Sequence, residues 1–423
     1  MSCSSLCRRV AAHRTILGAV LFAVCLPLVL GGCFNTRVAT RPAPVQVAPT
    51  VVAPPQPIAP APSAVAPEGD TVQVALLLPL SGPSAGIGRA MLDAAQLALF
   101  DIADERFSLL PRDTEGTPEG ASRAASAAIA GGAELILGPL LAAEVEAVKP
   151  IARDAKINVI AFSTATQLAG GNVFLMGFQP RQEVVREVSL AREKGLSRFA
   201  ALAPNSQYGH LMTDALRDAA TASGGSVAKV EYLDPRAADP SAAVKRLLGA
   251  APPAPGASPA PPPASAAFDA LLLPEGGAQL KQIARQLREA GLDAAQVRLL
   301  GSGLWDDPTI AGESALDGGW YAASPPEPRQ EFESRFQATY GHPAPRLASL
   351  AFDAAALAAV LGKSGEPFSQ EAILNPSGFT GVDGLFRFTS QGLVQRGLAV
   401  LEISPRGKTV VSPAPQNFQD FSY

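Results

Sequence analysis

The chain has 423 residues, of which 47% are hydrophobic, and its 34 Lys and Arg against 38 Asp and Glu give a net charge of −4. A chain of this length can bury a large core and form two domains. Because nucleic-acid binding needs stripes of Lys and Arg, this acidic and unclustered charge argues against a nucleic-acid partner.

The first residues carry the pattern of a secretion signal. Three arginines precede an apolar run at 15–30, and two glycines separate this run from Cys33. This order resembles a bacterial lipoprotein signal peptide over residues 1–32, which implies that Cys33 begins the mature chain and carries lipid on its thiol. Pro27 and the short run argue against a membrane helix, which needs about 20 uninterrupted apolar residues.

The positions of the cysteines support lipid attachment at Cys33. The other three cysteines precede the proposed cleavage site, so the mature chain offers no disulfide, zinc cluster or thiol nucleophile. Phe34 follows Cys33, where lipoproteins retained in the inner membrane usually carry an aspartate. The resemblance therefore implies an anchor in the outer membrane, with the chain facing the periplasm.

Residues 33–70 form a Pro- and Ala-rich segment. Nine of its residues are proline, which fixes φ and lacks an N–H, so the segment can form neither a helix nor a central strand. We predict a semi-rigid tether which, at about 3.1 Å per residue, reaches on the order of 100 Å. A disordered spacer explains the same composition equally well.

From residue 72 onwards, short apolar runs alternate with helical patterns. Val72–Leu80 is too short for a helix and is typical of a buried strand. Further strands are expected at 107–110, 133–137 and 158–161, and helices at 89–104, 118–130 and 142–154. Strands that alternate with helices indicate βαβ units and a parallel sheet, so the predicted fold class is α/β.

A second series of the same kind follows. Its strands are expected at 198–203, 227–232, 270–273, 297–300 and 318–323, and its helices at 181–194, 210–222, 240–249 and 278–290. The Pro-rich stretch 251–264 cannot lie in a sheet and is predicted to be an exposed loop. After helices at 329–340 and 348–361, strands at 386–388 and 398–403 are expected to pair with each other, and the tail to 423 to lie on the surface.

Five segments resemble, in their order and spacing, the type I periplasmic binding protein family, which includes receptors for branched-chain amino acids. They are VALLLPLSGP (74–83), ILGPL (136–140), VIAFSTAT (159–166), NSQYG (205–209) and LASLAFDAAALAAVL (347–361). The resemblance implies two doubly wound parallel-sheet lobes joined by three crossovers, near Gly177, Ala323 and Arg396. The first lobe would comprise 71–177 plus 324–396 and the second 178–323 plus 397–423, with ligands bound between them.

The resemblance places candidate ligand residues on loops that follow strands. They are Ser81, Ser163, Thr164, Thr166, Tyr208, Glu275 and Trp305. The hydroxyls and backbone amides at 163–166 suit a carboxylate, although helix capping explains them equally well. Tyr208 and Trp305 are candidates for aromatic walls over a ligand, with packing at the hinge as the alternative.

Two positions depart from the amino-acid receptors. Leu140–Ala142 offers no side-chain donor where such receptors place a serine, and Gln279 stands where an acidic partner for the ligand's ammonium is expected. Replacing a carboxylate by an amide removes a charge-assisted hydrogen bond of roughly 1.5–3 kcal/mol. Glu275 would substitute only with a different loop geometry, so the usual amino-acid site is impaired.

The stretch Gly378–Ile403, GFTGVDGLFRFTSQGLVQRGLAVLEI, is similar to the C-terminal part of bacterial lipoproteins called penicillin-binding-protein activators, which share this fold. This resemblance implies a regulator that binds and activates a penicillin-binding protein, a peptidoglycan synthase. The helical repeats of the best-known activators are not visible here. The alternative is a substrate-binding lipoprotein of an ABC transporter for amino acids or small amides.

No motif predicts catalysis, a metal or a cofactor. His210 and His342 stand alone, without Glu or His at helical ligand spacing. No nucleophile elbow surrounds Ser163, and the glycines at 82, 86 and 88 lack both the dinucleotide-binding spacing and a Walker lysine. We therefore expect a non-enzymatic protein, and we expect Asp353 to be a solvated or capping acid.

Overall fold

The computed structural model describes residues 71–102, 105–234, 236, 239–249, 267–310, 312–363 and 367–419. The predicted signal peptide, Cys33, the tether and the loop 251–264 lie outside these residues. Among the helices of the described part, none is long and apolar enough to cross a membrane.

The first lobe is built on a parallel five-stranded sheet in the order β2-β1-β3-β4-β5. Its strands are β1 (Val72–Leu78), β2 (Phe107–Asp113), β3 (Leu135–Leu137), β4 (Asn158–Ala161) and β5 (Val173–Leu175). The apolar run in β1 is buried on both faces, as a central parallel strand requires. Helices α2 (Pro118–Ala130) and α3 (Ala142–Asp154) pack on one face.

The other face of this sheet is covered by helices from both ends of the chain. They are α1 (Ala85–Ile102), α8 (Pro326–Tyr340) and α9 (Ala348–Leu361). The short helix α10 (Gln370–Ile373) adds Ile373 to the same hydrophobic core. α9 is buried around most of its circumference because it packs between α1 and the sheet. The first turn of α1 lies so close to the end of β1 that a Cβ atom at Gly88 would be 2.1 Å from the Pro79 carbonyl oxygen. Helix packing therefore accounts for this glycine.

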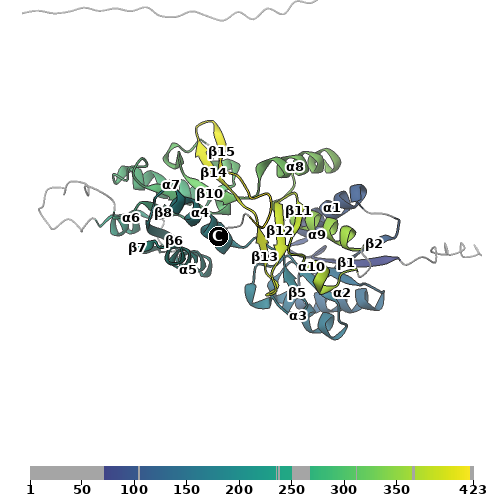
Figure 1. Ribbon diagram of the computed structural model, residues 1–423. Helices are drawn as coiled ribbons and strands as arrows, with labels where there is room; N and C mark the ends of the chain where they lie inside the picture. The colour runs from purple at the N-terminus through teal and green to yellow at the C-terminus, as the bar shows by residue number, and fades with distance from the viewer. Residues whose placement is uncertain are drawn as a thin grey trace, which may run out of the picture. The chain divides into compact units, whose positions relative to one another are not determined.

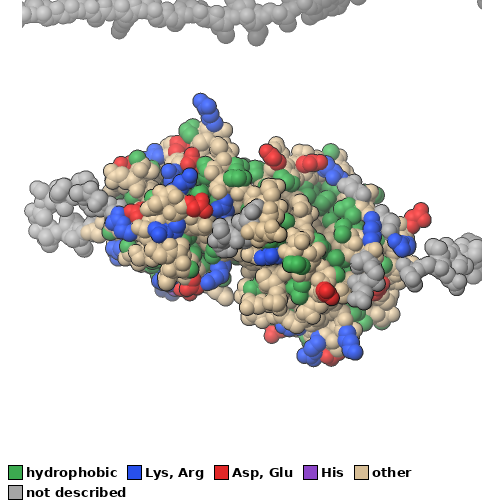
Figure 2. Space-filling view, in the orientation of Figure 1, with side chains coloured by type: hydrophobic (Ala, Val, Ile, Leu, Met, Phe, Trp, Pro, Cys, Tyr) green, Lys and Arg blue, Asp and Glu red, His purple; other side chains and the backbone are tan. Residues whose placement is uncertain are grey.

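The second lobe has a seven-stranded sheet in the order β15-β14-β10-β9-β8-β6-β7. The five parallel strands are β6 (Arg198–Pro204), β7 (Ser226–Leu233), β8 (Ala270–Leu272), β9 (Arg298–Leu300) and β10 (Trp320–Ala323). β14 (Ala399–Ser404) pairs antiparallel with β10, and β15 (Gly407–Ser412) pairs antiparallel with β14. Helices α4 (Pro180–Glu193) and α5 (Gln207–Ala222) cover one face, and α6 (Ser241–Leu248) and α7 (Gly277–Glu289) the other. Figure 2 shows acidic and basic side chains interspersed over this lobe. The predicted α/β fold class with two lobes is confirmed.

The chain passes between the lobes after β5, after β10 and after β13 (Val394–Arg396), and Figure 1 shows the C-terminal strands in yellow where they make the last passage.

The expected pairing of the strands at 386–388 and 398–403 with each other is wrong. The strand at 384–388, β12, pairs with β13 and with β11 (Phe379–Gly381) in a small antiparallel sheet, whereas β14 enters the second lobe and pairs with β10. β13 has only three residues, so no periodicity reveals it, and the tail contributes β15 rather than only surface loop.

Candidate functional site

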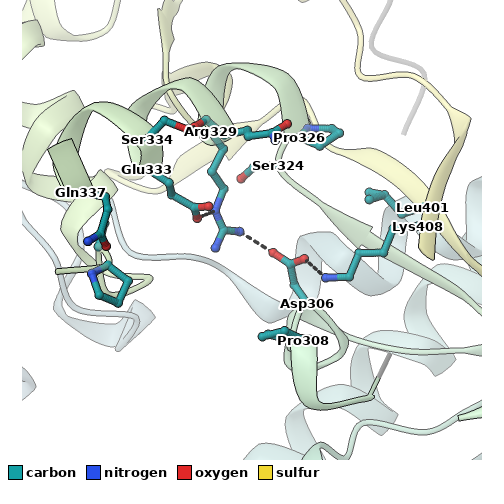
Figure 3. Close-up of a pocket in the computed structure, with 13 residues that line it drawn as sticks. Asp306, Pro308, Ser324, Pro326, Arg329, Glu333, Ser334, Gln337, Leu401 and Lys408 are labelled. Carbon is teal, nitrogen blue, oxygen red and sulfur yellow. Dashed lines mark hydrogen bonds and ion pairs between the residues drawn. The ribbon is translucent and has the colours of Figure 1, made fainter. Parts of the chain in front are cut away.

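A cavity of about 720 Å³ lies where the two lobes face each other. The first lobe contributes Arg329 and Glu333 from α8, and the second lobe contributes Lys408 from β15 and Asp306. Asp306 follows the 3-10 helix η2 (Gly303–Trp305), directly after β9. In Figure 3 these charged side chains point toward one another across the cavity, so both charge signs are available to a bound molecule.

Asp306 is the centre of the contacts across this cavity. It forms an ion pair with Arg329 of the opposite lobe, and Lys408 Nζ donates to its Oδ1 at 2.6 Å. The Tyr321 hydroxyl donates to the same oxygen at 3.3 Å. Burial alone would raise the pKa of Asp306, but the charges of Arg329 and Lys408 outweigh burial and hold this pKa below its usual value. The carboxylate is therefore ionised at neutral pH.

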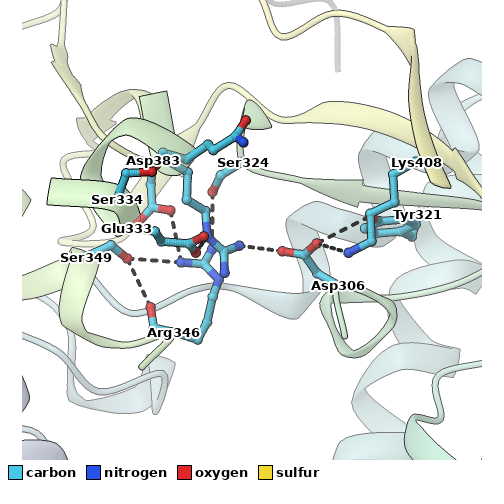
Figure 4. A network of polar contacts seen from close by, with 11 residues as sticks. Asp306, Tyr321, Ser324, Glu333, Ser334, Arg346, Ser349, Asp383 and Lys408 are labelled. Atoms are coloured by element: carbon cyan, nitrogen blue, oxygen red, sulfur yellow. Dashed lines mark hydrogen bonds and ion pairs between the residues drawn. The ribbon is translucent and has the colours of Figure 1, made fainter. Parts of the chain in front are cut away.

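Arg346 anchors a second polar network behind the cavity (Figure 4). Its guanidinium donates to Asp383 Oδ1 at 2.9 Å and to the hydroxyls of Ser349 and Ser324 at 3.0 and 3.2 Å. It also stacks on the ring of Phe178, 3.6 Å from the centroid. Phe178 and Ser324 lie at the first and second crossovers, so this network ties the hinge together.

Arg396 lies at the third crossover and also contacts the Phe178 ring. Its side chain is buried, and its Nη2 donates to the Met176 carbonyl at 3.0 Å. The guanidinium carbon of Arg396 is 5.1 Å from the centroid of the Phe178 ring. Asp353 lies in the same region and accepts from the backbone amides of Val382 and Asp383. Asp353 is therefore not solvated but caps the β11–β12 turn from a buried position, where burial and the charge of Asp383 raise its pKa.

Three carboxylates gather at the carboxyl edge of the second sheet. Glu183 and Glu187 lie one turn apart on α4, and Glu275 follows β8. Glu183 Oε2 accepts from the Gly303 amide at 2.8 Å, and Glu187 Oε1 from the Ala322 amide at 2.9 Å. Burial raises the pKa of Glu183 to about 7 and the pKa of Glu187 well above its usual value. We call Glu183, Glu187 and Glu275, with Tyr208 beside them, the acidic cluster.

Tyr208 lies in the first turn of α5 and is half-buried beside the three carboxylates. Burial raises the pKa of its hydroxyl, and the neighbouring carboxylates add to this effect, whereas a hydrogen bond with the Ser302 side chain opposes it. Burial also raises the pKa of Glu275. Within the described residues, no group of three or more His, Cys, Asp or Glu is arranged to hold a metal ion.

A family model described as periplasmic binding protein matches residues 71–408 of this chain. The chain belongs to the periplasmic binding protein family. A curated relative, the uncharacterized protein RP748 of Rickettsia prowazekii, is 23% identical over 168 residues, which are 40% of this chain and 44% of the relative. The match thus spans less than half of that relative's length.

Solved structures share the fold of this periplasmic binding protein. A putative branched-chain amino acid ABC transporter protein from Rhodospirillum rubrum is 18% identical, with a TM-score of 0.70, over 81% of this chain and 100% of its own. The substrate-binding protein LivJ of Streptococcus pneumoniae, solved in complex with isoleucine, is 18% identical, with a TM-score of 0.53, over 81% of this chain and 100% of its own. Identities this low establish the fold alone.

The hydroxyl residues predicted for the first lobe lie on the loops expected for a periplasmic binding protein, but none of them lines the cavity. Asp113 accepts from the Ser81 hydroxyl and amide, which helps to lower its pKa although burial opposes this. Ser163 is buried, and its Oγ accepts from the Ala165 amide at 3.2 Å, as a local turn requires. Thr164 and Thr166 are exposed.

The predicted aromatic wall at Trp305 is wrong. Its side chain is fully buried, its Nε1 donates to the Leu273 carbonyl at 3.2 Å, and it packs in the core of the second lobe. Gly301 and Gly319 leave the space that the ring fills, because a Cβ on either would lie within 2.7 Å of it. The buried indole satisfies its N–H with a backbone carbonyl, as buried tryptophans usually do.

The sequence interpretation did not identify Asp306, Arg329, Lys408 or Glu183. Glu183 lies in the first turn of a helix, where an acidic residue is common because it complements the helix dipole. Asp306 and Arg329 come from different lobes, so no local spacing connects them. The available signal was the position of Asp306 just beyond β9, at the carboxyl edge where this fold places its ligands.

Proposed function

We propose that this chain captures a small solute between its lobes and delivers it to an ABC transporter. The observation that carries the proposal is the cavity of about 720 Å³ with walls from both lobes. Small-molecule sites commonly have volumes of about 300–1,000 Å³ and lie between domains. The isoleucine complex of a protein with this fold supports a solute of similar size. The proposal assigns the chain no catalytic role.

Solute binding in this cavity would favour the closed arrangement of the lobes. A ligand that touches Arg329 on one lobe and Asp306 or Lys408 on the other has more contacts when the lobes are close. Such a differential affinity shifts the population toward the closed form, which a transporter can distinguish from the open one. The ion pair between Asp306 and Arg329 already favours closure without ligand.

A melting-temperature screen of the chain from residue 71 onwards tests solute capture. The panel contains leucine, isoleucine, acetamide, benzoate and 1,4-diaminobutane. Ligands that bind only the folded state raise its stability by about 2.7 kcal/mol at 100 times their Kd. We expect at least one compound to raise Tm with a saturating concentration dependence. A flat response to the whole panel contradicts solute capture.

We also propose that Cys33 carries lipid and holds the protein at the outer membrane. The order of arginines, apolar run and two glycines before Cys33, with Phe34 after it, supports this placement. Metabolic labelling with a fatty-acid probe should mark the wild-type chain and not Cys33→Ala. Label in the inner-membrane fraction alone would contradict outer-membrane sorting.

Activation of a penicillin-binding protein is the second candidate function. It is favoured by the likeness of Gly378–Ile403 to penicillin-binding-protein activators and by the absence of a side-chain donor at Leu140–Ala142. Cross-linking of the anchored protein followed by affinity capture distinguishes the candidates. Recovery of a peptidoglycan synthase supports activation, whereas recovery of permease subunits without a synthase supports solute delivery.

A further inference from the structure

We propose that Gln182 and Arg186 are positioning residues that hold the third crossover against α4 and thereby set the separation of the lobes in the unliganded protein. Their side chains lie one turn apart on the same face of α4. Neither side chain lines the cavity. The inference concerns the protein without a solute, so it goes beyond the proposed solute capture and does not depend on it.

Gln182 binds the outer edge of β13 in the way that a neighbouring strand would. Its Nε2 donates to the Val394 carbonyl, and its Oε1 accepts from the Arg396 amide at 3.0 Å. A residue of a parallel strand forms the same two hydrogen bonds, with a carbonyl and with the amide two residues later. The opposite edge of β13 pairs with β12. The side-chain amide therefore serves β13 in place of a strand residue.

This contact joins the two lobes. β13 belongs to the first lobe, because Val394 lies in the core of that lobe and Leu393 forms a parallel bridge with Leu175 of β5. Gln182 belongs to the second lobe, because α4 packs in the core of that lobe. A lobe movement that takes β13 away from α4 breaks both hydrogen bonds of Gln182. These bonds therefore favour the arrangement in which they form.

Arg186 anchors α4 to the chain just past the third crossover. Its Nε donates to the Leu398 carbonyl at 2.9 Å, and its Nη2 donates to the Ser412 hydroxyl at the end of β15. The Arg186 side chain is buried, so losing these partners would leave polar groups unsatisfied. Only Gly397 lies between Leu398 and the residue whose amide Gln182 holds. The two side chains thus grip the chain on both sides of the point where it changes lobe.

α4 also meets the other two crossovers. The helix begins at Pro180, directly after the first crossover, and Glu187 Oε1 accepts from the Ala322 amide next to the second one. One helix of 14 residues therefore contacts the chain at all three crossovers. Because Arg186 and Glu187 fix this helix within the second lobe, Gln182 is the α4 side chain whose bonds a lobe movement would change.

The distance between two spin labels tests the proposal. The chain from residue 71 onwards contains no cysteine, and its described residues form one compact unit. Ala143→Cys and Gln207→Cys place one label on each lobe, at exposed positions on the carboxyl edges of the two sheets. Methionine has the length of glutamine but cannot form the two hydrogen bonds to β13. We expect Gln182→Met to shift the distances in the unliganded protein to larger values and to broaden their distribution.

Arg186→Met has a matched control on the same helix. Arg192 donates to the carbonyls of Ser223 and Leu196, so these two bonds stay within the second lobe. We expect Arg186→Met to shift the distances in the same direction as Gln182→Met, and Arg192→Met to leave them as in the wild type. Gln182→Asn is a shorter amide that cannot reach both backbone groups, and it replaces Gln182→Met if that variant does not fold. Melting curves establish that each variant is folded.

The possible results separate this inference from the proposed function. If the folded variants at 182 and 186 keep the wild-type distance distribution, the proposal is overturned. If Arg192→Met shifts the distances as much as they do, general loosening of the second lobe explains the shift, and the proposal is again overturned. The labels are read without any solute, so a flat thermal screen would contradict solute capture and leave this result standing.

Discussion

Asp306 and Arg329, which belong to different lobes, form an ion pair whose side chains are only 19% and 16% exposed. Partial burial reduces screening by water, so this pair should contribute more than a surface pair. The pair Arg123–Glu115, within one lobe and 62% and 50% exposed, is a natural comparison.

A double-mutant cycle with Asp306→Asn and Arg329→Gln should give a coupling energy of about 1 kcal/mol or more in urea unfolding. The cycle with Glu115→Gln and Arg123→Gln should give a clearly smaller coupling energy, because water screens this exposed pair. Small-angle scattering should also show a larger radius of gyration for Asp306→Asn, because the contact between the lobes is lost. Equal coupling in the two cycles would show that the pair does not bridge the lobes as described.

Trp305 should matter for stability and not for ligand affinity. Trp305→Ala removes a fully buried ring and should cost about 3–5 kcal/mol. Trp305→Phe keeps most of the packing and removes one of the two donors to the Leu273 carbonyl, which still accepts from the Glu275 amide, so it should cost about 0.5–1.5 kcal/mol. Chemical denaturation measures both. A Trp305→Phe variant with wild-type stability and altered solute affinity would restore the aromatic-wall interpretation.

Glu183 should make stability depend on pH in an unusual direction. Burial raises its pKa to about 7, opposed by the Gly303 amide and the charge of Arg346, while Glu187 and Tyr208 face it from α4 and α5. Between about pH 4.5 and 7 the folded carboxyl therefore keeps a proton that the unfolded chain has lost. The stability contribution of this group accordingly falls as pH rises through that window.

Glu183→Gln keeps an uncharged side chain and removes this titration. We expect Tm of the wild type to fall more steeply from pH 5 to pH 7.5 than Tm of Glu183→Gln. Glu193→Gln, at the exposed end of the same helix, should follow the wild type. Identical slopes for all three proteins would mean that Glu183 titrates normally.

Glu187 should tolerate an amide but not truncation. Burial raises the pKa of Glu187 well above its usual value and so disfavours its charged form, and Gln at 187 has the same shape and can still accept from the Ala322 amide. We expect Glu187→Gln to change the free energy of unfolding by less than about 1 kcal/mol. Glu187→Ala leaves that amide unsatisfied and should cost about 1–3 kcal/mol or more. Equal losses for both would indicate an ionised Glu187.

The sequence predicted the architecture well because buried parallel strands and alternating helices leave a local pattern. The run at 74–78 is an example, since a strand covered on both faces must be apolar throughout. The partner of β14 was not predictable in this way. β13 has three residues, and Gly397 and Leu398 separate it from a strand that joins another sheet.

The candidate site was less predictable because it depends on residues far apart in the chain. The hydroxyls at 81 and 163 do lie at strand ends, yet each is engaged within the first lobe, by Asp113 and by the Ala165 amide. Whether a hydroxyl caps a turn or faces a ligand depends on a rotamer that the sequence does not encode locally. Arg329 and Asp306 meet only after both lobes have formed.

The order of elements along the chain has a consequence for biosynthesis. The first sheet is complete at β5, but α9, which packs against α1 on that sheet, is made only after most of the second lobe. The second sheet in turn acquires β14 only after residues 399–404 have been synthesised. A nascent chain that stops near residue 177 would expose the apolar face meant for α9, and closing such long loops is slow. Both lobes should therefore reach their native state together, late in synthesis, instead of one after the other.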